Sequence, residues 1–185
     1  MIALEHRELL LTLARNSIQE FLEPVSMPFE TKIPTELYAK SGVFVTLTKN
    51  KQLRGCIGSL GPSRTIWNQV KQNALLAAFS DSRFSPVEPD EVPLLKIQIS
   101  VLSPPKPFFF YTVQELLHKL ENEKPGVILS KDAFSATFLP SVWKEIQTSE
   151  EFLSELCQKA GLGKNEWKQP GLKIQLYFSE SFEEK

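Results

Sequence analysis

The first part of the chain carries apolar residues at helical spacing. Five of them share one face: Leu9, Leu10, Leu13, Ile18 and Phe21. The charged residues between them are left for the solvent side. A period near 3.6 is typical of an amphipathic helix, which we place over residues 5–22. Pro24, Pro28 and Pro34 then predict an extended segment, because proline fixes φ and cannot donate a backbone hydrogen bond.

Strict alternation replaces the helical pattern after Gly42. Apolar residues at 43, 45 and 47 alternate with Phe44, Thr46 and Thr48. This predicts a strand with two different faces. The polar residues 49–51 predict a short turn, so residues 52–60 should form a second strand that pairs with the first as a hairpin.

Small residues mark the next helix. Ala74, Ala77 and Ala78 recur on one stripe of residues 65–79, and such a stripe packs closely on a sheet. Residues 80–89 lack periodicity and predict a loop. Alternation over residues 96–101 then predicts a third strand.

Prolines at 104, 105 and 107 separate these elements from a second half with shorter patterns. There we predict a helix at 113–120, a hairpin through 127–138, a helix at 149–160 and a strand at 172–178. Thr148 and Glu151 fit a capping box, and Gly161 stands where a helix C-terminus favours glycine. Because hairpins exclude a purely parallel sheet, we expect an α+β fold with a mixed or antiparallel sheet and flanking helices.

Composition adds limits on size and partners. The 185 residues, 42% hydrophobic and 23% charged, suffice for one folding unit over residues 1–185 but not for two independent domains. A formal net charge of −1 attracts neither polyphosphate nor anionic lipid strongly, which disfavours nucleic acid as a partner. No signal peptide or membrane-spanning apolar stretch is expected, and Cys56 and Cys157 form no disulfide framework or metal-ligand spacing. We therefore expect a cytoplasmic protein.

Arg54, Gly55, Cys56 and Gly58 form the clearest chemical constellation. Alternation predicts that Arg54 and Cys56 project to the same side, while the two glycines permit close approach to the backbone. A guanidinium beside a thiol favours the thiolate, which acts as a nucleophile or metal ligand. Two alternatives stay open: Arg54 fixes an anionic ligand, or Cys56 is a small buried hydrophobe and Arg54 pairs with a nearby acid.

The predicted loop at 80–89 carries Asp81, Arg83 and Glu88, which could supply an acid, a base or ligand charge. The alternative is a salt bridge that only locks the loop. Farther along, the run 108–111 holds three phenylalanines and a tyrosine. Some of these rings must be buried, and any exposed remainder would indicate a partner surface.

The hexapeptide Leu53-Arg54-Gly55-Cys56-Ile57-Gly58 resembles the hallmark of the AMME chromosomal region family, also called AmmeMemoRadiSam system protein A. Further blocks resemble the same family in the same order: Asn73-Ala74, Asp81-Ser82-Arg83-Phe84, and residues 99–102, 138–142 and 152–162. The resemblance implies a larger and a smaller lobe around a cleft, with the hexapeptide at or near it. The resemblance then implies that Cys56 and Asp81 carry any catalysis. Five residues would contact a ligand: Arg54, Gly55, Gly58, Asn73 and Arg83.

The family resemblance also implies partners. Many prokaryotic members are encoded beside a radical S-adenosylmethionine enzyme and a Memo-like protein, which suggests a shared modification pathway. No reaction, cofactor, metal or oligomeric state follows from it. Many members carry Gly-Lys-His-Gly where this chain has Glu123-Lys124-Pro125-Gly126, and an arginine near Ala133 or Phe134. Both are absent here, which weakens catalysis and strengthens a binding role.

Two functions therefore stay open. An enzyme or enzyme subunit would use Cys56 as a thiolate, Arg54 as an anion anchor, and Asp81 or Glu88 as a proton carrier. A non-catalytic binding module would use the same cleft to hold a ligand or a pathway protein, and it would not need the thiol. A nucleic-acid role ranks third.

Overall fold

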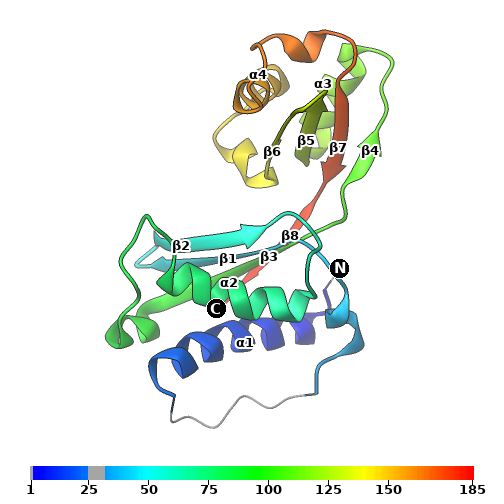
Figure 1. The fold of residues 1–185 in the computed structure, drawn as a ribbon. Helices are drawn as coiled ribbons and strands as arrows, with labels where there is room; N and C mark the ends of the chain where they lie inside the picture. Colours follow the sequence, from blue (N-terminus) through cyan, green and yellow to red (C-terminus); the bar gives the residue numbers. More distant parts are fainter. Residues whose placement is uncertain (1, 25–31) are drawn as a thin grey trace. The chain divides into compact units, whose positions relative to one another are not determined.

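A computed structural model describes residues 2–24 and 32–185, so most of the segment predicted to be extended around Pro28 lies outside the described residues. The chain forms two compact units, Met1–Ser103 with Glu180–Lys185, and Pro104–Ser179. Each unit has its own antiparallel strand pairs and its own helices, which confirms the α+β class (Figure 1). The boundary after Ser103 falls at the predicted proline-rich separation.

The first unit contains two long helices close to their predicted positions. α1 spans Leu4–Leu22 and α2 spans Ile66–Phe79. Thr65 caps the N-terminus of α2: its hydroxyl accepts a hydrogen bond from the Asn68 N–H at 3.3 Å and so satisfies one free donor of the first turn.

The predicted apolar face of α1 is wrong at its C-terminal end. Phe21 is 60% exposed and stacks on the Phe79 ring at a centroid distance of 4.4 Å. Leu11 and Ala14 are buried instead. The buried stripe is therefore rotated toward these two positions, and Phe21 packs at its margin.

The first sheet has the strand order β2-β1-β3-β8. Its strands are β1 (Val43–Lys49), β2 (Gln52–Ser59), β3 (Leu95–Leu102) and β8 (Ser179–Glu183). Central β1 pairs antiparallel with β2 and β3, which confirms the predicted hairpin. Two 3₁₀ helices, Thr35–Tyr38 and Pro89–Leu94, complete the unit.

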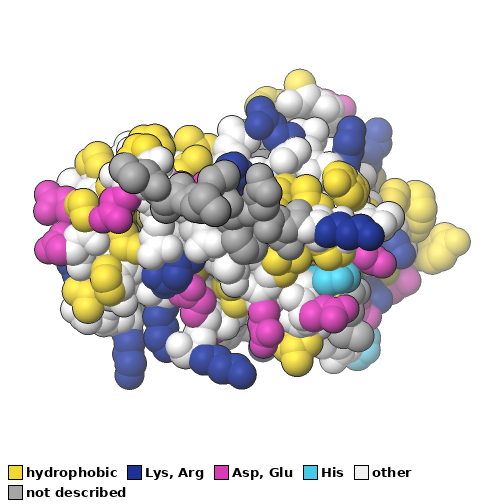
Figure 2. All heavy atoms as spheres, turned by 90° about the horizontal axis from the view of Figure 1, so that it is seen from below, with side chains coloured by type: hydrophobic (Ala, Val, Ile, Leu, Met, Phe, Trp, Pro, Cys, Tyr) yellow, Lys and Arg dark blue, Asp and Glu magenta, His cyan; other side chains and the backbone are white. Residues whose placement is uncertain are grey.

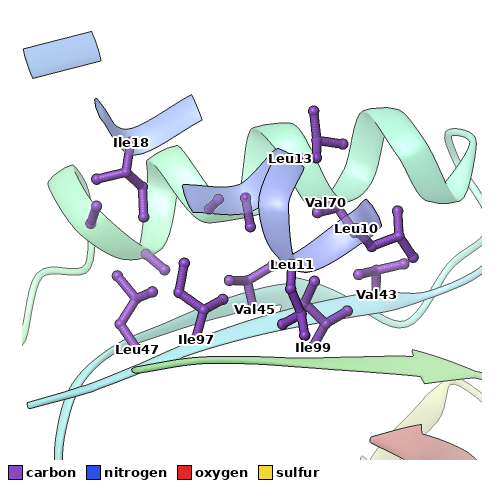
Figure 3. Packing of buried hydrophobic residues seen from close by; sticks show 14 of the residues in the cluster. Leu10, Leu11, Leu13, Ile18, Val43, Val45, Leu47, Val70, Ile97 and Ile99 are labelled. Atoms are coloured by element: carbon purple, nitrogen blue, oxygen red, sulfur yellow. The ribbon is translucent and has the colours of Figure 1, made fainter. Parts of the chain in front are cut away.

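The core of the first unit lies between its helices and one face of its sheet. Figure 3 shows Leu10, Leu11, Ile18 and Val70 of the two helices close to the apolar side chains of β1 and β3, while Leu13 points toward α2; the strand residues are Val43, Val45, Leu47, Ile97 and Ile99. These residues make up a cluster from which water is excluded, the main source of stability in such a layer. The opposite face of β1 carries Phe44, Thr46 and Thr48, as the alternation predicts.

Strand β8 was not predicted from the sequence. It contains one buried apolar residue, Phe182, in a run of polar ones. Ion pairs fasten this segment to α1: Arg7 pairs with Glu180, and Arg15 Nη2 lies 2.6 Å from Glu184 Oε2. Tertiary contacts, not a local hydrophobic pattern, therefore specify the strand.

The second unit has the sheet order β4-β7-β5-β6. Its strands are β4 (Lys106–Phe108), β5 (Gly126–Lys131), β6 (Phe134–Phe138) and β7 (Lys173–Tyr177). Its helices are α3 (Val113–Glu123) and α4 (Ser149–Lys159), and short 3₁₀ helices precede and follow α4 at Pro140–Lys144 and Glu166–Lys168. The hairpin, both helices and β7 match the prediction, whereas β4 was missed because it is only three residues long.

Both ends of α4 lie where they were predicted, and the structure shows the Thr148 half of the predicted capping box. Thr148 Oγ1 accepts a hydrogen bond from the Glu151 N–H at 3.3 Å. Gly161 follows the helix with φ +82°, a conformation that costs glycine nothing. Cys157 on α4 is fully buried among apolar side chains, and burial raises the pKa of its thiol.

The surface shows no dominant charge on the face drawn in Figure 2, where Lys and Arg lie interspersed with Asp and Glu. This arrangement agrees with the net charge of −1. Across residues 2–24 and 32–185, none of the helices combines the length and apolar character that crossing a membrane requires.

Candidate functional site

The Leu53–Gly58 segment lies in β2, which is an edge strand of the first sheet. Leu47 pairs with Gly55 but Thr48 pairs with Leu53, so Arg54 is an extra residue where the register shifts. Such a bulge interrupts the alternation of side chains. The alternation that predicts a shared side for Arg54 and Cys56 is therefore interrupted at Arg54, the extra residue between Leu53 and Gly55.

Arg54 is fully engaged within the fold. Its Nε and Nη2 donate to the two carboxylate oxygens of Glu91 at 3.1 and 2.9 Å, a bidentate pair. Its Nη1 also donates to the Ser85 carbonyl at 2.8 Å, and Lys49 Nζ lies 2.8 Å from Glu91 Oε1. Arg54 thus fastens the segment after α2 to the edge strand.

The same contacts explain the ionisation of Glu91. The hydrogen bonds from Arg54, helped by Lys49, lower the pKa of Glu91 to about 2 although burial opposes the shift. Glu91 was not singled out from the sequence. A local pattern could have indicated Glu91: Pro89 begins a helical turn and Glu91 follows two residues later, which is typical of a capped helix N-terminus.

The Glu91 ion pair makes stability depend on pH. Because its folded pKa lies below the value of about 4.3 for an unfolded glutamate, its contribution is full above that value and disappears as pH falls toward 2. We expect Glu91→Gln to cost on the order of 2 kcal/mol at pH 7, with the difference from wild type shrinking to near zero at pH 2. Urea unfolding across pH 2–7 measures this.

The exposed acid Glu8 offers the control for that titration. Glu8→Gln should leave the unfolding free energy unchanged at every pH. A difference between Glu91→Gln and wild type that stays constant from pH 7 to pH 2 would contradict the assignment.

Gly55 and Gly58 are close-approach positions. A Cβ added at Gly55 would lie 2.1 Å from the Ala77 carbonyl oxygen, which shows that the backbone of α2 passes directly over the strand. A Cβ at Gly58 would lie 2.3 Å from Cγ of Phe44, its cross-strand partner. Gly55 thus admits the helix, and Gly58 admits an aromatic ring of the sheet itself.

Asp81 and Arg83 close the free edge of β2 at Cys56. The Cys56 N–H donates to Asp81 Oδ2 at 2.8 Å, and Arg83 Nη2 donates to the Cys56 carbonyl at 3.2 Å. The two side chains pair with each other at 2.6 Å between Nη2 and Oδ2. We call this pair the edge clip, because it satisfies backbone groups that a further strand would otherwise bind.

The ionisation of Asp81 follows from the edge clip. Its side chain is only 4% exposed, and Oδ1 also accepts from the Arg83 Nε at 2.9 Å. The hydrogen bonds from Arg83, joined by the Cys56 N–H, hold the pKa of Asp81 far below its usual range. A carboxylate in this state has no proton to donate near neutral pH, and both of its oxygens are occupied.

Cys56 itself lies on the sheet face opposite the helices. Its partner across the strands is Thr46, whose hydroxyl oxygen is 3.2 Å from the Cys56 sulfur. The register of β1 with β2 and β3 gives the neighbours on this face, which we call the Cys56 face: Phe44, Thr46, Cys56, Gly58, Gln98 and Ser100. All six are partly exposed and none is charged.

Asn73 lies on the other side of the sheet. It is buried, and its side-chain amide donates to the Val43 carbonyl at 2.9 Å. Gln69, one turn earlier, was missed from the sequence and donates to the Ser41 carbonyl at 2.6 Å. Both amides fasten α2 to the strands, and neither reaches the Cys56 face.

Among the residues that the structure describes, no group of three or more His, Cys, Asp or Glu side chains forms a metal-ligand cluster. The structure thus brings together Cys56, Asp81 and Arg83 at the edge of β2. Arg54 binds Glu91 through the bulge, and Asn73 belongs to the helix interface.

Comparisons with known proteins agree over nearly the whole chain. The AMMECR1 family model matches residues 11–182. Protein MK0488 of Methanopyrus kandleri is 39% identical over 99% of this chain and 90% of its own length. Protein NEQ441 of Nanoarchaeum equitans is 34% identical over 93% of this chain and 97% of its own. The crystal structure of the uncharacterized protein PH0010 from Pyrococcus horikoshii superposes with a TM-score of 0.78 at 35% identity, covering 96% of this chain and 91% of that one.

Proposed function

The chain belongs to the AMMECR1 family, and we propose that it is a non-catalytic binding subunit in the modification pathway that the family resemblance implies. Its Cys56 face would hold a segment of a partner protein. One observation carries the proposal: the charged groups around Cys56 are already paired within the fold.

The contacts leave little for an enzyme. A proton carrier needs a group that changes ionisation near the working pH, and the pKa of Asp81 lies far below that range. An anion anchor needs a free guanidinium, whereas Arg54 binds Glu91 in bidentate fashion. An enzyme reading would therefore rest on the Cys56 thiol, on the partly exposed sheet face, and on Glu88, an exposed acid at the start of the 3₁₀ helix Pro89–Leu94.

The Cys56 face has the properties of a binding surface. Its six residues are uncharged, and the exposed Lys96 lies at its margin, two residues before Gln98 on the same side of β3. The face holds one aromatic ring at Phe44, and hydroxyl and amide groups at Thr46, Ser100 and Gln98 can donate or accept hydrogen bonds. A sheet supports it rigidly, and the edge clip fixes its outer margin. Such a surface suits an uncharged segment with an apolar side chain better than an anion or a nucleic acid.

The test uses the two partners that the family resemblance implies, a radical S-adenosylmethionine enzyme and a Memo-like protein from the same organism. The purified full-length chain is titrated with each partner by calorimetry. We expect one of them to bind and Thr46→Arg to weaken that binding at least 30-fold, because the variant places a long charged side chain in the middle of the face. Gln98→Arg is a second variant at the neighbouring position.

Thr12→Arg is the matched control, since Thr12 is exposed on α1. It should bind like wild type. If neither protein binds, or if both face variants bind normally while folded by circular dichroism, the proposed function is wrong.

A further inference from the structure

The second unit contains an open groove that the proposed function does not use. It has a volume of about 1010 Å³ and is lined by residues 107–113 and 167–175 with Ser130. All of these residues belong to the second unit. The groove therefore exists independently of the Cys56 face.

The floor of the groove is continuous with the core of the second unit. Trp167 and Ile174 are core residues, and four partly buried residues of the lining pack against the same core: Phe108, Phe110, Val113 and Leu172. A ligand would thus contact apolar surface that packing already holds rigid. Such surface can bury an apolar side chain of a partner.

The rim is aromatic and positively charged. Phe109 is 84% exposed and Tyr111 is 98% exposed, so the aromatic run at 108–111 is divided between floor and rim. Lys168 and Lys173 are the only charged residues of the lining. Neither forms an ion pair within residues 2–24 and 32–185, whereas nearby Lys131 pairs with Glu166. Lys168 Nζ lies over the Trp167 ring, 4.9 Å from its centroid, a contact that leaves its charge without a counter-ion. The two positive charges favour an anionic occupant.

The shape and the exposed rings favour a polypeptide over a small molecule. Small-molecule pockets span about 300–1000 Å³ and enclose their ligands, whereas this groove is open and lies at the top of that range. Two large aromatic side chains left in water beside it are typical of a protein contact surface.

Strand addition is not how such a segment would bind. β4 is the edge strand beside the groove, but it is three residues long and contains Pro107, which has no N–H to donate. Recognition would instead use side chains in the groove and the two lysines. We propose that this groove binds an acidic segment of a partner protein that carries aromatic or leucine side chains.

The probe is a fluorescein-labelled dodecapeptide in which Glu alternates with Phe and Leu, with a matched peptide in which every Glu is Lys. Fluorescence anisotropy with the full-length protein gives each Kd. We expect the acidic peptide to bind at least 10-fold more tightly than the basic one. Amide shifts in a two-dimensional NMR spectrum should change at residues 107–113 and 167–175.

Two double variants locate the contact. Lys168→Glu with Lys173→Glu should weaken binding of the acidic peptide at least 10-fold, and so should Phe109→Ala with Tyr111→Ala. Both pairs change only exposed or rim side chains, so the fold is retained. Lys144→Glu with Lys164→Glu makes the same charge change on exposed lysines outside the lining and should leave Kd within twofold of wild type.

Three results would overturn the proposal. The first is that the acidic peptide does not bind at 1 mM. The second is that the Lys168→Glu, Lys173→Glu variant binds the acidic peptide with the same Kd as the control Lys144→Glu, Lys164→Glu variant. The third is displacement of the peptide by indole-3-acetate at a similar Kd, because the groove would then be a site for small aromatic carboxylates. Each result leaves the Cys56 face untouched, since that face belongs to the first unit.

Discussion

Gly55→Ala is expected to destabilise the first unit by about 3–4 kcal/mol and to lower its Tm by about 10 °C or more. The new Cβ would lie 2.1 Å from the Ala77 carbonyl oxygen. The obstructing atom is helix backbone, so no rotamer change removes the clash. Either α2 moves away from the sheet or the edge of β2 unpairs. Thermal unfolding followed by circular dichroism measures the loss.

Gly61→Ala is the matched control, because a Cβ at Gly61 meets no atom within 4 Å. It should change Tm by less than about 2 °C, since surface substitutions have small effects. A Gly55→Ala protein as stable as Gly61→Ala would show that α2 does not pack on β2 as described.

Asp81→Ala is expected to cost about 3 kcal/mol of unfolding free energy at pH 7. The carboxylate is buried and accepts hydrogen bonds from the Cys56 N–H and from Arg83. Its removal leaves the edge of β2 open and the amide of Cys56 without its acceptor. Chemical denaturation gives the free energy, and hydrogen exchange should show at least 100-fold faster exchange at the Cys56 amide.

Two comparisons make the Asp81 result specific. Asp90→Ala removes the same charge from an exposed position and should be close to neutral. Arg83→Ala should destabilise less than Asp81→Ala, because Arg83 is 54% exposed and water can replace its contacts. Unchanged exchange at Cys56 in Asp81→Ala would refute the edge clip.

The sequence predicted most regular elements because their patterns are local. The alternation of Val43, Val45 and Leu47 reflects a strand whose one face meets helices, and the alanine stripe of α2 reflects close packing on that face. β8 escaped prediction because its position depends on Glu180 and Glu184 meeting arginines of α1, about 170 residues away in the chain. Contacts of that range leave no periodic signal.

The candidate site was predictable in its members but not in its geometry. The family hexapeptide lies in β2, and the salt bridge that the loop charges allow is the Asp81–Arg83 pair. The bulge at Arg54 could not be predicted, because one extra residue reverses the alternation and nothing in the local pattern marks it. Glu91, which binds Arg54, lies 37 residues farther along the chain.

Cys56→Ser in the partner-binding titration tests most directly whether the site works without its thiol. Serine keeps the size of the side chain and its contact with Thr46 while removing thiolate chemistry. We expect Cys56→Ser to bind the partner within twofold of wild type and to support growth of a strain lacking the gene as well as wild type does. A folded Cys56→Ser protein that binds the partner but fails to support growth would contradict a non-catalytic role.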